Sequence, residues 1–339
     1  MSKFNVNTIT SKSGSNGPVL AGITTVNSTG SMRIPSGPTE HRGGRGRGIL
    51  GPGAAVPGPA VFTTQNYIEI ATTANALDFG DLSYGNAYRG GLASSTRGVF
   101  VNGQNDQTTD YVTISSKGGG SDFGEILNEP MGGATLSNNI FGFRCGGSDG
   151  GVHTDQIIGM RIAHTGSFYD FGDLIHAGTY QNGASSPTRG IIFGEATPSS
   201  PVTNNTIQYV TMTSQGNAKD FGDLITARKY ADTAGNTTRA LAAGGQATPS
   251  ANTNSIEYVT IATTGNATDF GDLAYATSCG KSGVVSSATR GIFAGSNPAP
   301  TSRIDYVTIM STGNSADFGD MTADIEYPGG CSDSNGGLG

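Results

Sequence analysis

The chain has 339 residues, of which 54 are glycine and only 13% are charged, and its net charge is -7. Val, Ile and Phe recur at regular intervals, which excludes global disorder, and the glycines follow no three-residue period, which excludes collagen. No apolar run reaches the roughly 18 residues that a membrane-spanning helix needs. We therefore expect a soluble, turn-rich, all-β protein.

Residues 1–44 differ from the rest of the chain. They are polar and too poor in apolar residues to build a core, so we expect an extended arm that becomes ordered only against a partner or a symmetry-related copy. Residues 1–60 carry a charge of about +5 and the remainder about -12. The arm either docks onto an acidic surface or is a solvated leader. The stretch GGRGRG at 43–48 is a single copy without aromatic residues, which disfavours nucleic-acid binding.

An internal repeat dominates the chain from residue 45 onward. The clearest copy is SIEYVTIATTGNATDFGDL at 255–273, and close copies occupy 206–224 and 303–321. More degenerate copies lie at 66–82, 110–126 and 156–174. The aspartates that open the DFG elements are 44, 48, 50, 49 and 48 residues apart: Asp78, Asp122, Asp170, Asp220, Asp269 and Asp317.

A second element precedes each of these copies. It consists of TRG or TRA, an apolar run and usually a glycine, at 96–103, 188–195, 238–245 and 289–296. In the third unit NNIFGFRCGG at 138–147 fills this place without the arginine. A further segment, such as ITARKYADTAG at 225–235, links DFGDL to the next TRG. Each unit thus predicts four short strands, and helices should be scarce because no period of 3.6 residues is sustained.

Four antiparallel strands that repeat every 45 to 50 residues are typical of a β-propeller blade. Residues 45–54 look like one more TRG element, and residues 324–339 lie where another would begin. We therefore predict a six-bladed propeller over residues 45–339. Its first blade is split between the two ends of the repeat, so that residues 324–335 pair in the sheet that contains 45–54.

The order of these elements, with a glycine pair after the second strand, resembles the Kelch repeat over roughly residues 45–339. The usual Kelch tryptophan is absent, and the phenylalanine of DFGDL takes its place.

The repeated polar and aromatic residues predict structural roles, because they recur once per blade. We expect the aspartates of DFGD to cap tight turns and the TRG arginines to pair with them between blades; lining a channel is the alternative. These arginines are Arg97, Arg189, Arg239 and Arg290. The phenylalanines expected in the core between blades are Phe79, Phe123, Phe171, Phe221, Phe270 and Phe318.

No arrangement in the sequence predicts catalysis. DFGD contains the kinase triplet, but six copies without an HRD element argue against a kinase. The histidines are dispersed, although His164 and His176 share a unit and could approach each other; the others are His41 and His153. No HExxH spacing is present, and paired carboxylates for glycoside hydrolysis depend on distances in space. We expect no enzymatic activity, no cofactor and no metal site, and the sequence leaves the binding residues unassigned.

The cysteines Cys145, Cys279 and Cys331 are odd in number and widely spaced. They are typical of buried or incidental thiols in a protein made in a reducing cytoplasm. The start MSKFNVNTIT lacks the apolar core of a classical signal peptide.

Four segments that break the repeat are candidates for binding, because specificity usually resides in loops on a rigid scaffold. They are rich in Ser, Thr, Asn and Pro, which suits glycans, a neighbouring protein or inert turns equally. Almost no aromatic residue occurs in them, which weakens the glycan interpretation. The segments are residues 128–139, 145–156, 195–205 and 246–254.

Two stretches are similar to virus proteins. GSMRIPSGPTEHR in the arm resembles short β-elements that open tail-fibre and other virion proteins of tailed bacteriophages. The elements TRGIFAGS and IEYVTIATTGNATDFGDL resemble repeats in structural proteins of phages that infect marine cyanobacteria. The resemblance implies a non-enzymatic virion protein of tail-fibre or tail-tip type, assembled in the host cytoplasm. Its arm would attach to other virion proteins, and its propeller loops would bind a host surface glycan or receptor, or neighbouring proteins.

Further expectations concern the assembly of the protein and its partners. The protein would form a homo-oligomer in the particle, without nucleic-acid binding or membrane insertion. The alternative is a capsid decoration, head-fibre, neck or baseplate protein with a purely assembly role. A secreted hydrolase propeller is disfavoured by the missing signal peptide and the unpaired cysteines.

Overall fold

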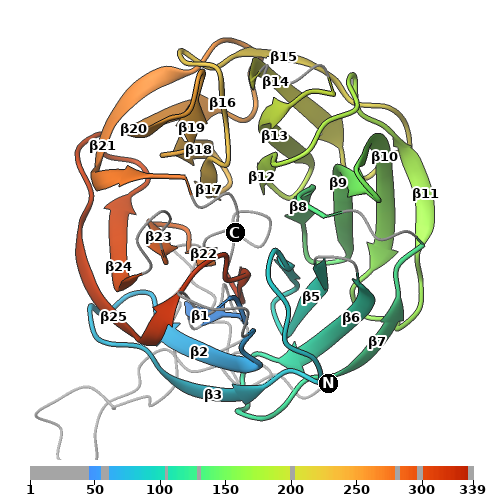
Figure 1. The fold of residues 1–339 in the computed structure, drawn as a ribbon, viewed down its shortest axis with the longest axis vertical. Coiled ribbons are helices and arrows are strands. Elements are labelled where there is room, and N and C mark those ends of the chain that lie inside the picture. Colours follow the sequence, from blue (N-terminus) through green and yellow to red (C-terminus); the bar gives the residue numbers. More distant parts are fainter. Residues whose placement is uncertain are drawn as a thin grey trace, which may run out of the picture. The chain divides into compact units, whose positions relative to one another are not determined.

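The computed structural model describes residues 46–54, 61–103, 106–127, 131–198, 203–278, 283–295 and 301–334. Within these ranges the chain forms 26 strands and no helix. The strands build six antiparallel sheets that surround one axis, as Figure 1 shows. This arrangement is a six-bladed β-propeller and confirms the predicted fold class.

Each blade is given from its innermost to its outermost strand. Blade I contains β26 (Gly330–Ser332), β1 (Arg47–Leu50), β2 (Thr64–Glu69) and β3 (Leu77–Asp81). Blade II contains β4 (Gly90–Ala93), β5 (Arg97–Gly103), β6 (Asp106–Thr113) and β7 (Ser121–Glu125). Blade III contains β8 (Ala134–Ser137), β9 (Phe141–Asp149), β10 (Val152–Arg161) and β11 (Tyr169–Asp173).

The second half of the ring follows the same order. Blade IV contains β12 (Asn182–Ser185), β13 (Arg189–Ala196), β14 (Thr203–Thr211) and β15 (Lys219–Asp223). Blade V contains β17 (Asp232–Gly235), β18 (Arg239–Ala243), β20 (Ala251–Thr260) and β21 (Thr268–Thr277), with two short added strands, β16 (Arg228–Lys229) and β19 (Gln246–Ala247). Blade VI contains β22 (Gly283–Ser286), β23 (Arg290–Ala294), β24 (Thr301–Thr308) and β25 (Ala316–Ile325).

Blade I is completed by residues from both ends of the described chain. β26 pairs with β1 in the register Gly48↔Ser332, Ile49↔Cys331 and Leu50↔Gly330. The backbone N–H of Arg47 also donates to the Asp333 carboxylate at 3.0 Å. The predicted closure of the ring, in which residues 324–335 pair with 45–54, is therefore confirmed.

The fourth strand of each unit is shorter than the sequence indicates. In blade V we predicted it within residues 225–235, but the innermost strand is only Asp232–Gly235, and most of the preceding residues form a connection from the outer strand. The inner strands of the six blades converge on the axis, where little space is available. Short strands of three or four residues satisfy this geometry.

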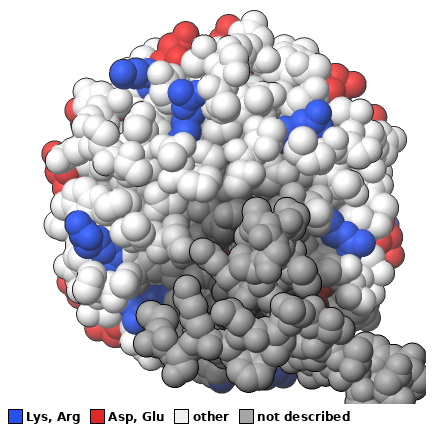
Figure 2. All heavy atoms as spheres, turned by 180° about the vertical axis from the view of Figure 1, so that it is seen from behind, with Lys and Arg blue, Asp and Glu red and all other residues white. Residues whose placement is uncertain are grey.

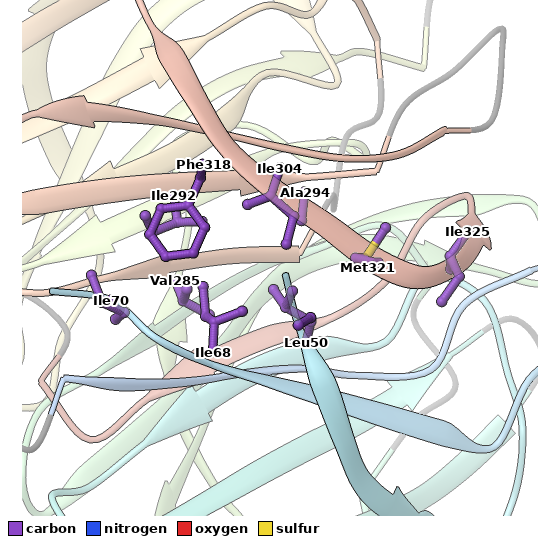
Figure 3. Packing of buried hydrophobic residues seen from close by; sticks show 11 residues of the cluster. Leu50, Ile68, Ile70, Val285, Ile292, Ala294, Ile304, Phe318, Met321 and Ile325 are labelled. Atoms are coloured by element: carbon purple, nitrogen blue, oxygen red, sulfur yellow. The ribbon is translucent and has the colours of Figure 1, made fainter. Parts of the chain in front are cut away.

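Apolar side chains fill the space between each blade and the next. Figure 3 shows the cluster between blades VI and I, where Leu50 and Ile68 meet Ile304 and Phe318 from the facing sheet. The other five junctions contain clusters of the same kind. All six DFG phenylalanines are buried at these junctions, which confirms their predicted role: Phe79, Phe123, Phe171, Phe221, Phe270 and Phe318.

The antiparallel strand order gives the ring two different faces. The linked face carries the turns between the first and second strands and between the third and fourth strands, counted from the axis. The loop face carries the hairpins between the second and third strands and the connections from each outer strand to the next inner strand. Figure 2 shows one side of the molecule, with basic side chains spaced around it and acidic side chains near the periphery.

Two predictions fall outside this description. The extended arm at residues 1–44 and Cys279 lie outside the described residues. In the part of the chain that is described, no helix is long and apolar enough to cross a membrane.

Candidate binding site on the loop face

The repeated arginines lie on the linked face and join neighbouring blades. Arg239 of blade V donates to the backbone carbonyl of Ile309 in blade VI at 3.1 Å, and its guanidinium lies 4.4 Å from the ring centre of Tyr258. Equivalent bonds to a carbonyl of the next blade are made by Arg47, Arg97, Arg189 and Arg290. The predicted position between blades is correct, but the predicted partner is wrong. The arginines bind carbonyls and tyrosine rings, whereas the DFGD aspartates lie on the outermost strand of each blade.

The DFGD elements join blades through their backbone rather than their carboxylates. The Phe270 carbonyl accepts from the N–H of Gly313 in the next blade, and the Asp272 N–H donates to Asn314 at 3.0 Å. A turn cap by an aspartate is seen at Asp122, whose carboxylate accepts from Gly124 N–H. The first aspartate of every copy is exposed on the outermost strand. Charges at these positions discourage pairing of the free sheet edges with other chains.

Blade III departs from this pattern. Phe141 stands where the other blades have the arginine, and it packs against the apolar cluster between blades III and IV. Arg161 on the adjacent strand lies over the Phe141 ring at 5.3 Å. The junction between blades III and IV therefore has an apolar contact in place of the arginine bond.

The cysteines and histidines occupy unrelated positions. Cys145 and Cys331 are buried free thiols, and burial raises the pKa of Cys145 to about 12. His164 and His176 flank opposite ends of β11, so they lie on different faces. Instead, His176 approaches Glu195 with Nδ1 3.6 Å from Oε1. Among the described residues, no group of three His, Cys, Asp or Glu side chains could hold a metal ion.

The four segments that break the repeat all contribute to the loop face, but they are less irregular than predicted. Residues 145–156 form a β-hairpin from the ends of β9 and β10. Residues 246–254 form β19 and the start of β20, and residues 195–205 include the ends of β13 and β14. The described part of 128–139 leads into the inner strand β8. Hairpins with hydrogen-bonded backbones therefore form this face in blades III, IV and V.

A narrow polar channel runs along the axis between the inner strands. Its cavity volume is about 80 Å³, enough for a few water molecules. Ser137, Ser185, Ser286 and Ser332 line its end near the linked face, and Arg89 lines it near the loop face. Several of these serines bond between blades: the Ser332 hydroxyl donates to the Ser286 carbonyl at 2.6 Å.

Four tyrosines lie on the loop face, one in each connection that leads into an inner strand of blades I, II, IV and V. The rings of Tyr88 and Tyr327 stack with centroids 4.3 Å apart, and those of Tyr180 and Tyr230 are 4.2 Å apart. Burial raises the pKa of Tyr230, and the phenols of Tyr180, Tyr88 and Tyr327 raise it further. We call Tyr88, Tyr180, Tyr230 and Tyr327 the tyrosine quartet.

Every member of the quartet has a left-handed backbone conformation. The φ angles are between 52° and 62°, and no other non-glycine residue among the described ones has a positive φ. Gly132 takes the corresponding position in blade III with φ of 79°. A side chain at such an angle costs about 1–2 kcal/mol relative to glycine. The connection itself accepts glycine, so the tyrosines are present for their rings.

Neighbouring residues fix the connections that carry the quartet. Arg89, next to Tyr88, pairs with Asp110 at 2.9 Å and Asp106 at 3.3 Å. Gln181, next to Tyr180, donates to the Cys145 carbonyl at 3.1 Å.

The other two connections are fixed in similar ways. Arg228, two residues before Tyr230, pairs with the buried Glu257, and burial lowers the pKa of Arg228 to about 10. Glu326, next to Tyr327, exchanges backbone hydrogen bonds with Ala54. The quartet is therefore held in place before any ligand arrives.

A buried carboxyl group lies on the same face between blades III and IV. Glu195 is 1% exposed and accepts from Asn204 Nδ2 at 3.0 Å. Burial raises the pKa of Glu195, whereas Asn204 and His176 lower it by a smaller amount.

The sequence carries a signal for the quartet in the repeat itself. The tyrosines stand in NAYRGG, GTYQNG, RKYADT and IEYPGG, each shortly before an inner strand. The binding residues were expected in the irregular segments, where aromatic residues are almost absent. The prediction therefore missed the quartet, whose members recur with the blades.

The fold and this site define a β-propeller with one face closed by repeated links and one face that presents an aromatic cluster. No protein-family model matches the chain. No curated protein is similar to it at a significant level.

Proposed function

We propose that this protein is a non-enzymatic binding component of a virus particle, of tail-fibre or tail-tip type, that uses its loop face to recognise a host surface or a neighbouring protein. The observation that carries the proposal is the difference between the two faces. The linked face repeats the same contacts around the ring, whereas the loop face combines hairpins of different length with a fixed aromatic cluster. Binding specificity usually resides in such variable elements on a rigid scaffold.

The repeated charged side chains support a role in binding rather than in catalysis. The arginines join blades, and the DFGD aspartates line the exposed sheet edges. The aspartates thus have a structural role in every blade, and the arginines have one in every blade except blade III. The assignment to a virion rests on the resemblance of the repeat and of the arm to phage structural proteins.

A purely assembly role, as a capsid decoration, head-fibre, neck or baseplate protein, is the second candidate. It is favoured by the carboxylates on the outermost strands, which are complementary in charge to residues 1–60, whose charge is about +5. The arm of one copy could then bind the rim of the next, and the protein would form a homo-oligomer in the particle.

Immunogold electron microscopy of intact virions tests the proposal, with antibodies raised against the full chain. Label at fibre ends or the tail tip is the expected result. Label spread over the head would favour the assembly role, and absence from the particle would contradict both. Deletion of residues 1–44 should abolish incorporation and leave the ring folded.

A further inference from the structure

We infer that the tyrosine quartet is the contact surface for a neutral carbohydrate chain. This inference rests on the proposed recognition function and names its ligand class. It starts from the strained backbone: four tyrosines adopt a conformation that glycine adopts at the same place in blade III. Strain that the neighbouring structure maintains in this way is commonly found at functional sites.

The quartet has the two kinds of surface that a sugar ring requires. Each of its four residues is half-buried, so part of the quartet remains accessible to a ligand. Sugar rings present C–H groups, which pack on aromatic rings, beside hydroxyl groups, which exchange hydrogen bonds with phenols. Tyrosine also supplies a large contact area with few rotatable bonds, so little conformational entropy is lost on binding.

The surroundings of the quartet are polar but nearly uncharged. Beside Tyr230, the hairpin of blade V carries Gln246 and Asn252, and Thr203 and Thr248 share a hydrogen bond of 2.6 Å in the adjoining hairpin region. Amide and hydroxyl groups of this kind serve as both donors and acceptors for hydroxyl groups.

The charged groups near the quartet are largely matched within the protein. Arg89 pairs with two aspartates and Arg228 pairs with Glu257, and both arginines are buried. Lys229 lies over the Tyr230 ring at 5.3 Å. A nucleic acid or a phosphorylated ligand requires a cluster of available cations, because most of its affinity comes from its charge. Among the described residues the quartet has no such cluster around it, so a neutral ligand fits better.

The rigid quartet suits a ligand that consists of repeated units, each of which binds weakly. The connections are fixed by buried ion pairs and backbone bonds, so binding should require little ordering of the protein. A polysaccharide offers many equivalent units, and a homo-oligomer in the particle would bind several of them at once. Weak contacts at single sites then combine into firm attachment.

The variant Tyr180→Gly/Tyr230→Gly removes two rings of the quartet and keeps the left-handed backbone that carries them. Glycine is the residue that blade III already uses at this position, so the double variant should fold. Tyr84→Ala is the matched control, because Tyr84 is 55% exposed on the connection that also carries Tyr88. Thermal unfolding confirms that each variant has the native fold.

Affinity electrophoresis of the full chain tests the inference. The protein, which carries a net charge of -7, migrates in native gels that contain an α-glucan, a β-glucan, a mannan or a galactan. We expect at least one neutral polysaccharide to retard the wild type and the Tyr84→Ala variant. Its apparent affinity for Tyr180→Gly/Tyr230→Gly should fall by about tenfold or more. Because the chain has no tryptophan, a change in tyrosine fluorescence reports binding at the same time.

Several outcomes would overturn the inference. The first is that none of the four polysaccharides retards the wild type. The second is that a polysaccharide retards the wild type and the double variant equally. The third is that a proline-rich peptide binds the protein and no polysaccharide does. The proposed function is judged separately, by immunogold labelling and by competition of the full chain with virions for host cells. If the double variant competes as well as the wild type, recognition stands and the carbohydrate site at the quartet fails. Absence of label and of competition would contradict the proposed function itself.

Discussion

The two faces of the propeller use the same six-fold repeat in opposite ways. On the linked face, an arginine bond and a backbone bond between neighbouring blades recur at most junctions, and an asparagine accepts a further bond at four of them. On the loop face, the corresponding residues differ from blade to blade: Arg89, Gln181 and Ala231 follow three equivalent tyrosines.

This difference shows what repetition accomplishes in a closed ring. Each blade must bind two neighbours, so the contacts that hold blades together have to be the same everywhere. Once one face supplies these contacts, the hairpins on the other face can vary in length and chemistry without opening the ring. The comparison predicts that substitutions on the linked face affect stability, whereas those on the loop face affect binding.

The largest loss of stability is expected for the substitution Gly271→Ala in a DFGD element. Gly271 has φ of 144°, and an added Cβ would lie 2.4 Å from the Gly313 carbonyl oxygen in the next blade. Backbone strain and the clash together should reduce the free energy of unfolding by about 3 kcal/mol. Gly150→Ala is the control: its φ is 54°, but nothing lies within 4 Å of the added atom. It should cost about 1 kcal/mol in chemical denaturation. Equal losses of stability in the two variants would contradict the structural role of the contact between Gly271 and Gly313.

A smaller loss is expected for Arg239→Ala on the linked face. The substitution removes the bond to the Ile309 carbonyl and the contact with the Tyr258 ring. A hydrogen bond from a charged donor and a cation–π contact together predict a loss of about 2 kcal/mol. Arg161→Ala, in the blade where phenylalanine replaces the repeated arginine, should lose less than about 1 kcal/mol. The same loss at both sites would show that the carbonyl bond contributes nothing.

On the loop face, Tyr230→Gly should change the stability at neutral pH by no more than about 1 kcal/mol, because relief of strain offsets the lost stacking. The difference in stability between this variant and the wild type grows in alkaline solution. Burial and the neighbouring phenols raise the pKa of Tyr230 above its ordinary value of 10, so the folded state favours the neutral phenol. Its contribution to stability is present below pH 10 and is lost as the pH rises further.

Alkaline unfolding, followed by circular dichroism and by the absorbance of ionised tyrosine, checks this expectation. The midpoint should shift to higher pH in Tyr230→Gly and remain unchanged in Tyr84→Ala. An unchanged midpoint in Tyr230→Gly would mean that the quartet does not oppose ionisation.

A small gain in stability is expected for Glu195→Gln. Burial raises the pKa of Glu195 above its ordinary 4.5, so the folded state favours the neutral carboxyl. This contribution is present below pH 4.5 and is lost as the pH rises through the folded-state pKa. The variant should therefore be more stable than wild type at neutral pH by about 1 kcal/mol, with the gain vanishing in acid. Glu125→Gln, an exposed position on β7, serves as the control in thermal unfolding.

The fold was predictable from the sequence because the residues that define it recur. The DFG phenylalanines mark the core of every junction, and the two partial units at 45–54 and 324–339 show how the ring closes. The partners of the arginines were not predictable. A side chain that crosses to the next blade meets residues about 70 positions away, such as Ile309 for Arg239, and sequence spacing does not show whether it reaches a carboxylate or a carbonyl.

The candidate site was harder to predict than the fold. Tyr88 and Tyr327 stack because the ring closes, and their separation along the chain gives no indication of this. Their left-handed backbone also has no sequence marker, because glycine is the residue expected at such angles. Only the position of each tyrosine relative to its inner strand could have identified the set.

Closure by a strand of three residues has a consequence for how the chain folds. Blades II to VI each consist of consecutive residues, so they can form in order as the chain is synthesised. Blade I lacks its innermost strand until Gly330–Ser332 is available to pair with Arg47–Leu50. That contact spans most of the chain and carries a high entropic barrier, since distant segments must meet before any bond forms. We therefore expect ring closure to be the last and slowest step in folding, and until then the exposed sides of blades I and VI are open to misassembly with other chains.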